Sequence, residues 1–237
     1  MQDLLTIVIP CYNEELYIGR TLRHIKRQLG TDGVRIIISD AGSVDSTLSI
    51  IEKLKNQLDL RVEVVKGGLP AVGRNAGADL ATTPYLLFID ADITFTDKTV
   101  ISRALTCLRN EDFAMVGTCP KYRGEFDFRA KLIFSVNRMI TWYLSKTKPF
   151  AIGGFILVRR LVFLKLGGFD EKAHQSEDWL LSRQIEPKKF RFMPDLITQD
   201  NRRFKRYGYF KMIGLVFRNW LNRNNASYFY KDQNYWR

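Results

Sequence analysis

The sequence predicts an α/β fold in which helices cover a mostly parallel central sheet. The first 120 residues alternate short apolar, β-branched runs with stretches of helical periodicity, the pattern of strands joined by crossover helices. The composition, 46% hydrophobic and 26% charged, is that of an ordinary globular protein and excludes collagen-like and disordered classes. At 237 residues the chain is long enough for one large core with additions.

Each element of the first half has its own sequence signal. Strands are expected where apolar and β-branched residues run together, at residues 5–9, 34–39, 61–65, 85–89 and 113–117. Helices are expected between them, at residues 14–29, 43–57, 70–80 and 97–109. Pro70 suits the first turn of its helix, because that position needs no backbone N–H. This half should therefore form a doubly wound sheet.

The alternation stops after residue 120, where the pattern becomes more helical. We expect a basic, aromatic helix at residues 126–144, a strand at 155–158, and helices at 160–166, 177–185 and 205–223. No linker rich in Pro, Gly or Ser interrupts the chain. The expected organisation is one domain over residues 1–206, with halves at 1–120 and 121–206, followed by an amphipathic helix and an aromatic tail over residues 207–237.

Charge is distributed unevenly along the chain, which carries +12 at pH 7. Residues 1–120 hold 13 Lys and Arg against 15 Asp and Glu, a net −2, whereas the remaining residues are at +14. A positive excess favours an anionic partner, such as nucleic acid, an acidic membrane surface or a phosphorylated substrate. That partner is expected at the second half.

The cysteines and the N-terminal residues suggest a cellular location. Three cysteines at unrelated spacings form neither a metal knuckle nor an even disulfide set, so a reducing compartment is expected. The N-terminus lacks the charged and apolar regions of a signal peptide, and no uncharged window reaches the roughly 20 apolar residues that span a bilayer. We expect a cytoplasmic protein, at the cytoplasmic face of the membrane if it meets one.

Acidic residues follow the predicted strands at their carboxyl ends, where sheets of this kind bind ligands. Asp90-Ala91-Asp92 comes directly after the apolar run at residues 85–89. Two carboxylates at the exit of a buried strand need water, a cationic partner or a metal ion, and Mg²⁺ or Mn²⁺ would share them with a substrate phosphate. The alternative is a polar turn whose aspartates cap a helix.

Six motifs occur in order along the chain: Thr6–Glu15, Ser39–Thr47, Gly73–Gly77, Phe88–Asp92, Gly167–Asp170 and Glu177-Asp178. Together they resemble glycosyltransferase family 2, over roughly Leu4 to Arg206. The resemblance implies a single GT-A domain with a Rossmann-like nucleotide-binding half. It also implies inverting transfer of a sugar from a nucleoside-diphosphate sugar of UDP or GDP type to an acceptor hydroxyl or phosphate, with Mn²⁺ or Mg²⁺ as cofactor.

The resemblance gives donor-binding roles to the first two strand-end loops. Pro10, Tyr12 and Glu14 would line the base and ribose pocket, and Asp40 would hydrogen-bond the base. Ala41 stands where the family more often has a second aspartate. The identity of the nucleotide therefore stays open.

Further donor-binding residues come from the later motifs. Arg74 would reach the base or a phosphate, with a surface ion pair as the alternative. In the Asp90-Ala91-Asp92 run, Asp90 would hold the ribose side and Asp92 the metal, with Asp90 as its second carboxylate. Gly154 would let the backbone approach the donor sugar, although tight packing explains a glycine there equally well.

The resemblance places the catalytic base at Glu177-Asp178, with Asp178 preferred. Inversion needs a base that removes the acceptor proton, and the start of a helix would keep a carboxylate ionised for that task. The alternative is that both acids only cap the helix. His174, shortly before them, is either a third metal ligand or an ordinary loop histidine.

Arg202 follows a strand-like run at residues 196–198. It would either contact the donor diphosphate or remain a solvated surface charge. The run Gln199–Arg202 only faintly resembles the Gln-x-x-Arg-Trp motif of processive family members, because Arg203 replaces the tryptophan. Processive polymerisation with a membrane channel is therefore not expected.

Two segments of the second half, residues 126–144 and 205–223, combine aromatic side chains with Lys and Arg. Such helices can lie at a membrane interface with their cations on anionic lipid. A polyprenyl-phosphate-linked acceptor would then suit both the charge and the aromatic residues. The alternative is that both helices pack their apolar faces on the core.

Two other functions share part of this pattern. A nucleotidyltransferase acting on a sugar phosphate would share the α/β half and the paired carboxylates, but it would not need Asp178. A nucleic-acid-binding module would use the basic, aromatic tail, but it leaves the strand-end carboxylates unexplained. No nucleic-acid partner is therefore expected.

Overall fold

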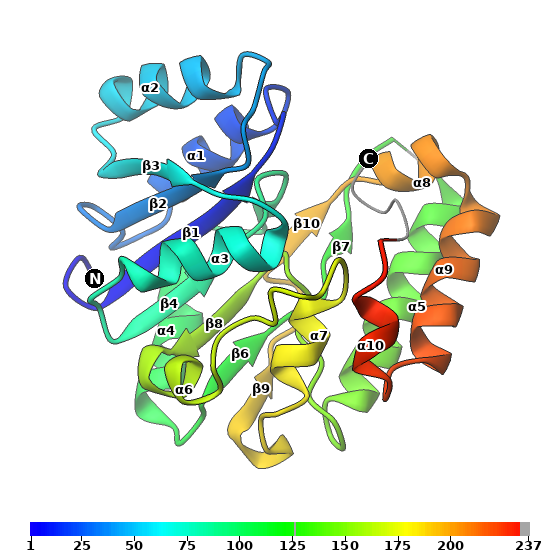
Figure 1. Ribbon diagram of the computed structural model, residues 1–237. Helices are drawn as coiled ribbons and strands as arrows, with labels where there is room; N and C mark the ends of the chain where they lie inside the picture. Colours follow the sequence, from blue (N-terminus) through cyan, green and yellow to red (C-terminus); the bar gives the residue numbers. More distant parts are fainter. Residues whose placement is uncertain (126, 233–237) are drawn as a thin grey trace.

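Seven strands form the central sheet of the computed structural model, which describes residues 1–125 and 127–232 (Figure 1). Their order is β3 (Val62–Lys66), β2 (Arg35–Asp40), β1 (Leu5–Cys11), β4 (Tyr85–Phe88), β8 (Ile156–Arg159), β6 (Met115–Gly117) and β9 (Phe190–Phe192). Neighbouring strands are parallel except at β8, which runs antiparallel to β4 and β6. The predicted α/β class with a mostly parallel sheet is confirmed.

Helices cover both faces of this sheet. Helices α1 (Ile18–Lys26), α2 (Thr47–Gln57) and α4 (Val100–Asn110) share one apolar cluster, and α3 (Pro70–Asp79) and α6 (Arg160–Lys165) share another. Successive strand residues point to opposite faces, so Ile7 and Ile9 of β1 join the first cluster and Val8 the second. With both faces covered, the inner strands are nearly continuous apolar runs, which is why the sequence predicts them.

A second, three-stranded sheet lies beside the first. It consists of β5 (Thr94–Phe95), β10 (Ile197–Gln199) and β7 (Lys121–Tyr122), with β10 in the middle. Strands of two or three residues are too short for a period-two pattern, so the sequence does not predict this sheet. Its effect is to bring residues 197–199 next to the chain that follows β4.

The predicted helix at residues 205–223 is wrong, because the chain forms two helices there, α8 (Arg202–Tyr207) and α9 (Tyr209–Leu221). Gly208 separates them with φ +84° and ψ 145°, a conformation that favours glycine. The helix at 126–144 is α5 (Phe128–Leu144), and the helix at 177–185 is the shorter α7 (Glu177–Ser182). A 3₁₀-helix (Pro187–Lys189) and α10 (Ala226–Phe229) complete the described elements. Residue 126 of the helix predicted at 126–144 and residues 233–237 of the predicted aromatic tail lie outside the described residues.

Helices α5 and α9 expose most of their apolar side chains. Within the described part of the chain, α5 buries only Ala130 and Thr141, and α9 buries only Met212. The exposed set is Phe128, Leu132, Val136, Met139, Ile140, Trp142, Tyr143, Phe210, Ile213, Val216, Phe217, Trp220 and Leu221. The alternative that both helices pack their apolar faces on the core is therefore wrong. Over residues 1–125 and 127–232, no helix combines the length and the apolar character that crossing a membrane requires.

Candidate functional site

Strands β1, β2, β3 and β4 are parallel, so the loops that follow them meet at one edge of the sheet. Side chains from the second half of the chain reach the same edge. Glu177 comes from the start of α7 and Arg202 from the start of α8, and each pairs with a residue of the first half. The predicted donor loops and the predicted base are therefore parts of one site.

Arg74 on α3 is the centre of one ion-pair network. Its side chain is 2% exposed; Nη2 donates to Asp90 Oδ1 at 2.8 Å, and Nη1 pairs with Glu177 Oε1. The guanidinium lies over the Phe169 ring, 5.4 Å from its centroid. Although burial opposes the charged form, Glu177 and Asp90 raise the pKa of Arg74. A surface ion pair is therefore the wrong interpretation, because Arg74 joins α3, the exit of β4 and α7 from inside the protein.

Gly153 and Gly154 lie beside this network. A Cβ atom on Gly153 would stand 2.5 Å from Arg74 Nη2 and 3.5 Å from Asp178 Oδ2. A Cβ atom on Gly154 would stand 3.0 Å from Ile197 Cδ1 of β10. The first glycine therefore makes room for the arginine, and the second allows the small sheet to pack closely.

Asp178 is held by backbone donors. Its Oδ2 accepts the N–H of Gly153 at 2.7 Å, and its Oδ1 accepts the N–H of Trp179 at 2.7 Å. Burial and the neighbouring charge of Glu177 raise the pKa of Asp178 to about 7, although Arg74 opposes this rise. The expectation that the helix start keeps this carboxylate ionised is therefore wrong, because burial outweighs the effect of a six-residue helix.

Arg202 is the centre of a second network. It donates to both carboxylate oxygens of Glu14 at 2.8 Å and lies 2.9 Å from Asp92 Oδ2. The Tyr17 ring centroid is 4.4 Å from its guanidinium carbon, and Gln199 Nε2 donates to Asp92 at 3.1 Å. Burial raises the pKa of Glu14, and the hydrogen bond from Arg202 offsets part of that rise. Arg202 is therefore part of the site and not a solvated surface charge.

Asp40 shapes its own loop. Its carboxylate accepts the N–H groups of Gly42 and Ser43, each at 2.9 Å, and also the Ser43 hydroxyl. Burial raises the pKa of Cys11, and the charges of Glu14 and Asp40 add to that rise, so both carboxylates lie near this thiol. Asp40 thus lies at the common edge, with much of its hydrogen-bonding capacity used by the turn.

The remaining predicted residues differ in how far they reach the site. Tyr12 is 52% exposed on the rim after β1, and Pro10 is partly buried within that strand. Ala91 is buried, and its carbonyl oxygen accepts the hydroxyl of Thr21 at 2.6 Å. His174 donates its backbone N–H to the Phe229 carbonyl of α10. Among the described residues no three His, Cys, Asp or Glu side chains gather as a metal-ligand group, so His174 does not join the two aspartates.

Asp90 and Asp92 nevertheless fit a divalent cation. Mg²⁺ and Mn²⁺ often take only one or two carboxylates when substrate phosphates complete their shell. Each carboxylate contacts a guanidinium, Arg74 at Asp90 and Arg202 at Asp92. A cation at Asp92 would therefore compete with Arg202, and an anionic ligand that draws this arginine away would favour its binding.

Gln199 and Tyr17 contact the site but are absent from the residues predicted for it. Gln199 had a signal in the sequence, because it begins the Gln199–Arg202 run that faintly resembles the Gln-x-x-Arg-Trp motif. In the structure both side chains contact Asp92. Tyr17 had none, because an aromatic residue just before a helix is ordinary in any fold.

Comparisons with known proteins identify the family of the chain. Residues 6–167 match the model of the family described as glycosyl transferase family 2. A processive diacylglycerol beta-glycosyltransferase of Mycoplasma genitalium is 30% identical over 158 residues, which are 58% of this chain and 46% of that protein. The chain thus spans less than half the length of this relative.

Two solved structures share the fold. The mannosyltransferase PcManGT from Pyrobaculum calidifontis, in complex with GDP-Man and Mn²⁺, superposes with a TM-score of 0.66 at 19% identity, over 85% of this chain and 57% of that one. Residues 1–349 of TarS from S. aureus, in complex with UDP-GlcNAc, superpose with a TM-score of 0.63 at 22% identity, over 84% of this chain and 59% of that one. The family match favours glycosyl transfer over nucleotidyl transfer. This chain belongs to glycosyl transferase family 2.

Proposed function

We propose that the protein transfers a sugar from a nucleoside-diphosphate sugar to an acceptor hydroxyl or phosphate, with inversion at the anomeric carbon. One observation carries the proposal. Asp178, a carboxyl group with a pKa of about 7, lies beside the Arg74 network at the edge where the strand-end loops meet. A base with a pKa close to neutral next to a fixed guanidinium suits the removal of an acceptor proton and the departure of an anionic group.

The donor would bind along the strand-end loops. Tyr12 and Asp40 would face the base, and Asp90 the ribose. The pairing of Arg202 with Glu14 and Asp92 supports a role at the diphosphate, because phosphate oxygens can replace carboxylate oxygens around the same guanidinium. We propose that Asp92, with Asp90, also holds Mn²⁺ or Mg²⁺, which supplies positive charge to the diphosphate when bound.

Asp178 would act as the base. As the acceptor oxygen attacks the anomeric carbon, its proton passes to the Asp178 carboxylate and a new carbon–oxygen bond forms. The bond from the anomeric carbon to the diphosphate breaks, and its electron pair leaves with the nucleoside diphosphate. The N–H groups of Gly153 and Trp179 hold the carboxylate in place during this step. Glu177 is engaged with Arg74 and would act by positioning that arginine.

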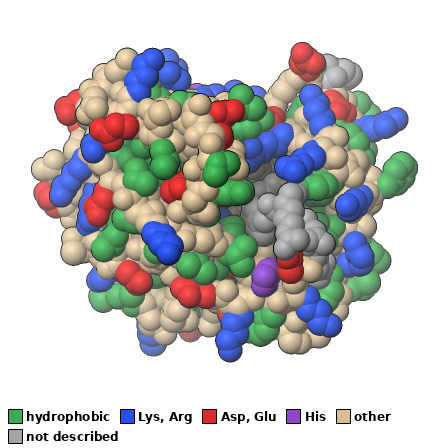
Figure 2. All heavy atoms as spheres, turned by 45° about the horizontal axis from the view of Figure 1, so that its top comes forward, with side chains coloured by type: hydrophobic (Ala, Val, Ile, Leu, Met, Phe, Trp, Pro, Cys, Tyr) green, Lys and Arg blue, Asp and Glu red, His purple; other side chains and the backbone are tan. Residues whose placement is uncertain are grey.

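We further propose that α5 and α9 rest on an anionic membrane at its cytoplasmic face. Residues 128–148 contain five Lys and Arg and no acid, and residues 202–223 contain seven and no acid. Figure 2 has blue basic and green apolar side chains together over the right-hand side of the molecule, where α5, α8 and α9 lie. Exposed apolar side chains flanked by cations are complementary to a bilayer with acidic headgroups. Residues 1–206 would then carry the reaction, and the helix and tail over 207–237 would contribute to docking.

A nucleotide screen tests the donor proposal. A ligand that binds only the native state raises the apparent melting temperature, so UDP, GDP, dTDP and CMP are compared with Mn²⁺, Mg²⁺ or no metal. We expect one nucleotide to give a metal-dependent shift, and Asp178→Asn to keep that shift while losing sugar transfer. The absence of any shift, or substantial turnover by Asp178→Asn, would refute the donor site or the base, respectively.

Vesicle sedimentation tests the membrane proposal. Phosphatidylcholine vesicles containing phosphatidylglycerol should bind the protein at low salt and release it as salt rises, since exposed charges are screened. Phe210→Ser should weaken binding because Phe210 is 94% exposed on α9. Leu161→Ser is the matched control, because Leu161 is 79% exposed on α6, away from these helices. Equal loss in both variants, or no binding at low salt, would contradict the proposal.

A further inference from the structure

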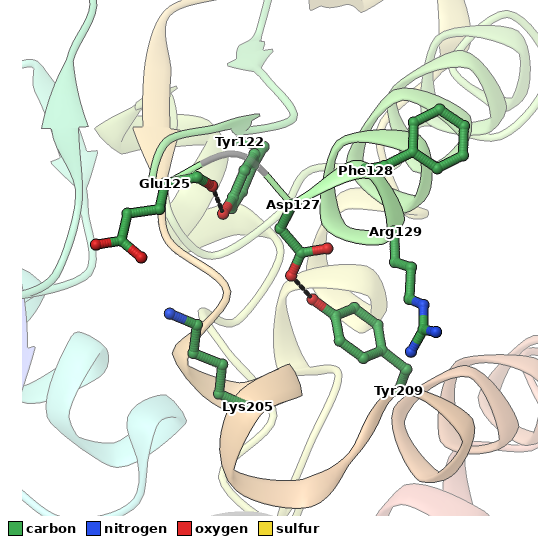
Figure 3. Close-up of a pocket in the computed structure, with 7 residues that line it drawn as sticks. All are labelled: Tyr122, Glu125, Asp127, Phe128, Arg129, Lys205 and Tyr209. Carbon is green, nitrogen blue, oxygen red and sulfur yellow. Dashed lines mark hydrogen bonds between the residues drawn. The ribbon is translucent and has the colours of Figure 1, made fainter.

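A cavity of about 480 Å³ lies between the start of α5 and the α8–α9 hairpin. One side is lined by Tyr122, Glu125, Asp127, Phe128 and Arg129, and the other by Lys205 and Tyr209. Figure 3 shows the Lys205 and Arg129 side chains on opposite sides of this cavity, with the Asp127–Tyr209 pair between them. A volume of this size suits a small ligand or the head of a larger one.

The two cations of the cavity are available to a ligand. Among the described residues, neither Arg129 nor Lys205 forms an ion pair through its side chain, and both are exposed. The carboxylate of Asp127 is already used: it accepts the N–H of Ala130 at 3.1 Å, Asn201 Nδ2 at 2.9 Å and the Tyr209 hydroxyl. The cavity therefore presents two cations that form no ion pair with a described residue and one carboxylate, Asp127, which keeps its negative charge because its hydrogen-bond donors are neutral.

Glu125 is the remaining acid on the rim. Its backbone carbonyl accepts the Tyr122 hydroxyl at 2.7 Å, while its carboxylate forms no ion pair within the described part of the chain. In Figure 3 this carboxylate points away from Tyr122 and lies on the same side of the view as the Lys205 ammonium group. Glu125 would weaken the attraction of an anion, so removing its charge gives a test of opposite sign.

The cavity is tied to the proposed transfer site by a short piece of chain. On one side of this piece of chain, Gln199 at the end of β10 and Arg202 both contact Asp92 of the proposed transfer site. Between them, Asn201 contacts Asp127 and Tyr209 of the cavity. Strand β7, which ends at Tyr122 in the cavity wall, pairs with β10. A molecule in the cavity is therefore one strand away from the carboxylates assigned to the donor.

The cavity also lies at one end of the proposed membrane surface. Asp127 and Tyr209 join the starts of α5 and α9, and Lys148 Nζ lies 3.4 Å from Asn224 Oδ1 just beyond their ends. The two helices thus run side by side, and Phe128, 65% exposed, belongs both to the cavity lining and to the apolar surface. An amphiphilic ligand could place its polar head in the cavity and its apolar part along these helices.

We propose that this cavity binds the phosphate group of the acceptor, with Arg129 and Lys205 as its cationic partners. A phosphate monoester carries a charge of about −1.5 to −2 at neutral pH and offers three acceptor oxygens, which matches two cations on opposite walls. The inference rests on the proposed transferase function, because it gives that reaction its acceptor site.

Calorimetric titration of the full chain with octyl phosphate tests the proposal, with octyl glucoside as the uncharged probe and inorganic phosphate as the chain-free probe. Octyl phosphate should bind and octyl glucoside should not. Lys205→Ala and Arg129→Ala should each weaken octyl phosphate roughly tenfold, since a hydrogen bond to a charged group is lost. Glu125→Gln should strengthen it.

Matched controls separate a site from general charge attraction. Lys165→Ala on α6 and Arg109→Ala on α4 remove the same charges at exposed positions outside the cavity, and they should leave binding unchanged. Octyl phosphate that binds much tighter than inorganic phosphate identifies a lipid-borne acceptor, and equal affinity identifies a soluble phosphate. Unchanged affinity in Lys205→Ala and Arg129→Ala, or an equal loss in the controls, overturns the proposal.

The nucleotide shift keeps the two proposals distinguishable. Lys205→Ala and Arg129→Ala should retain the metal-dependent nucleotide shift of the parent protein, because Arg74 and Arg202 are the cations that pair with Glu14, Asp90 and Asp92 in the described part of the chain. If the parent shows that shift but no octyl phosphate binding, this inference fails and the proposed function stands. If the parent shows no nucleotide shift, the proposed function itself fails.

Discussion

Removing the guanidinium of Arg74 should cost the protein a large share of its stability. Arg74→Met leaves Glu177, whose side chain is 5% exposed, without its cationic partner, whereas Asp90 at 25% exposure can turn to water. Breaking a buried ion pair by removing one partner typically costs about 3–5 kcal/mol. Arg74 Nε is itself buried and has no hydrogen-bond partner among the described residues, and the variant removes that cost. We therefore expect a loss near the lower end, about 3 kcal/mol.

Urea unfolding followed by tryptophan fluorescence measures this loss. If the unfolding free energy falls with urea concentration at the same slope in the variant and the parent, the cooperativity of unfolding is unchanged. Adding Glu177→Gln to Arg74→Met should recover part of the stability, because the unpaired buried charge is then gone. Arg103→Met is the matched control: its pair with Asp97 has both side chains nearly half exposed, so it should cost at most about 1 kcal/mol. An Arg74→Met loss no larger than the control's would refute the reasoning.

Four further changes test the site. The kcat/KM for the donor should rise with pH through about 7 as Asp178 ionises. Glu177→Gln should lower the pH at the midpoint of this rise, because the variant removes a negative charge next to Asp178, and an unchanged midpoint would contradict this. The pKa of Asp178 in the folded protein lies above its ordinary value of 3.8, so the folded state holds this proton to higher pH than the unfolded state does. The contribution of Asp178 to the free energy of unfolding should therefore fall as pH rises from about 4 to 7. Asp178→Asn should remove this pH dependence of the unfolding free energy, measured by urea titration at each pH. Gly153→Ala should destabilise the protein by about 1–3 kcal/mol, because its Cβ would stand 2.5 Å from Arg74 Nη2, and Gly214→Ala is a control with open space around it. Arg202→Gln should tighten Mn²⁺ binding to the donor-free protein and weaken nucleotide binding, measured by calorimetry; unchanged Mn²⁺ affinity would exclude competition at Asp92.

The sheet could be predicted from sequence where local signals agree. β1 has apolar residues on both faces and is buried from Leu5 to Ile9, and Pro70 does occupy the start of α3. The small sheet could not be predicted, because β5 and β7 are two residues each and exist only through their pairing with β10. The break at Gly208 could not be predicted either, because an isolated glycine is tolerated within many helices.

The positions of the site residues were easier to predict than their partners. The rule that strand ends meet at one edge is enough to group Glu14, Asp90 and Asp92. Two of the ion pairs join residues that are far apart in the chain: Arg202 is 188 residues from Glu14, and Arg74 is 103 residues from Glu177. No local pattern records such a pairing. A buried arginine and an exposed one look alike in the sequence, because only the fold determines which of them loses water.

The same pairings change what the charge of each half means. Residues 1–120 are at −2 and the rest at +14, which suggests two electrically separate parts. In the folded protein Arg202 from the basic half pairs with Glu14 and Asp92 of the acidic half, and Glu177 from the basic half pairs with Arg74. The strand-end site therefore contains both cations and carboxylates, and its cations can pair with a diphosphate in place of the carboxylates. The unpaired cations that remain, such as Arg129 and Lys205, lie on α5 and α8, and this is where an anion other than the donor would meet a positive surface.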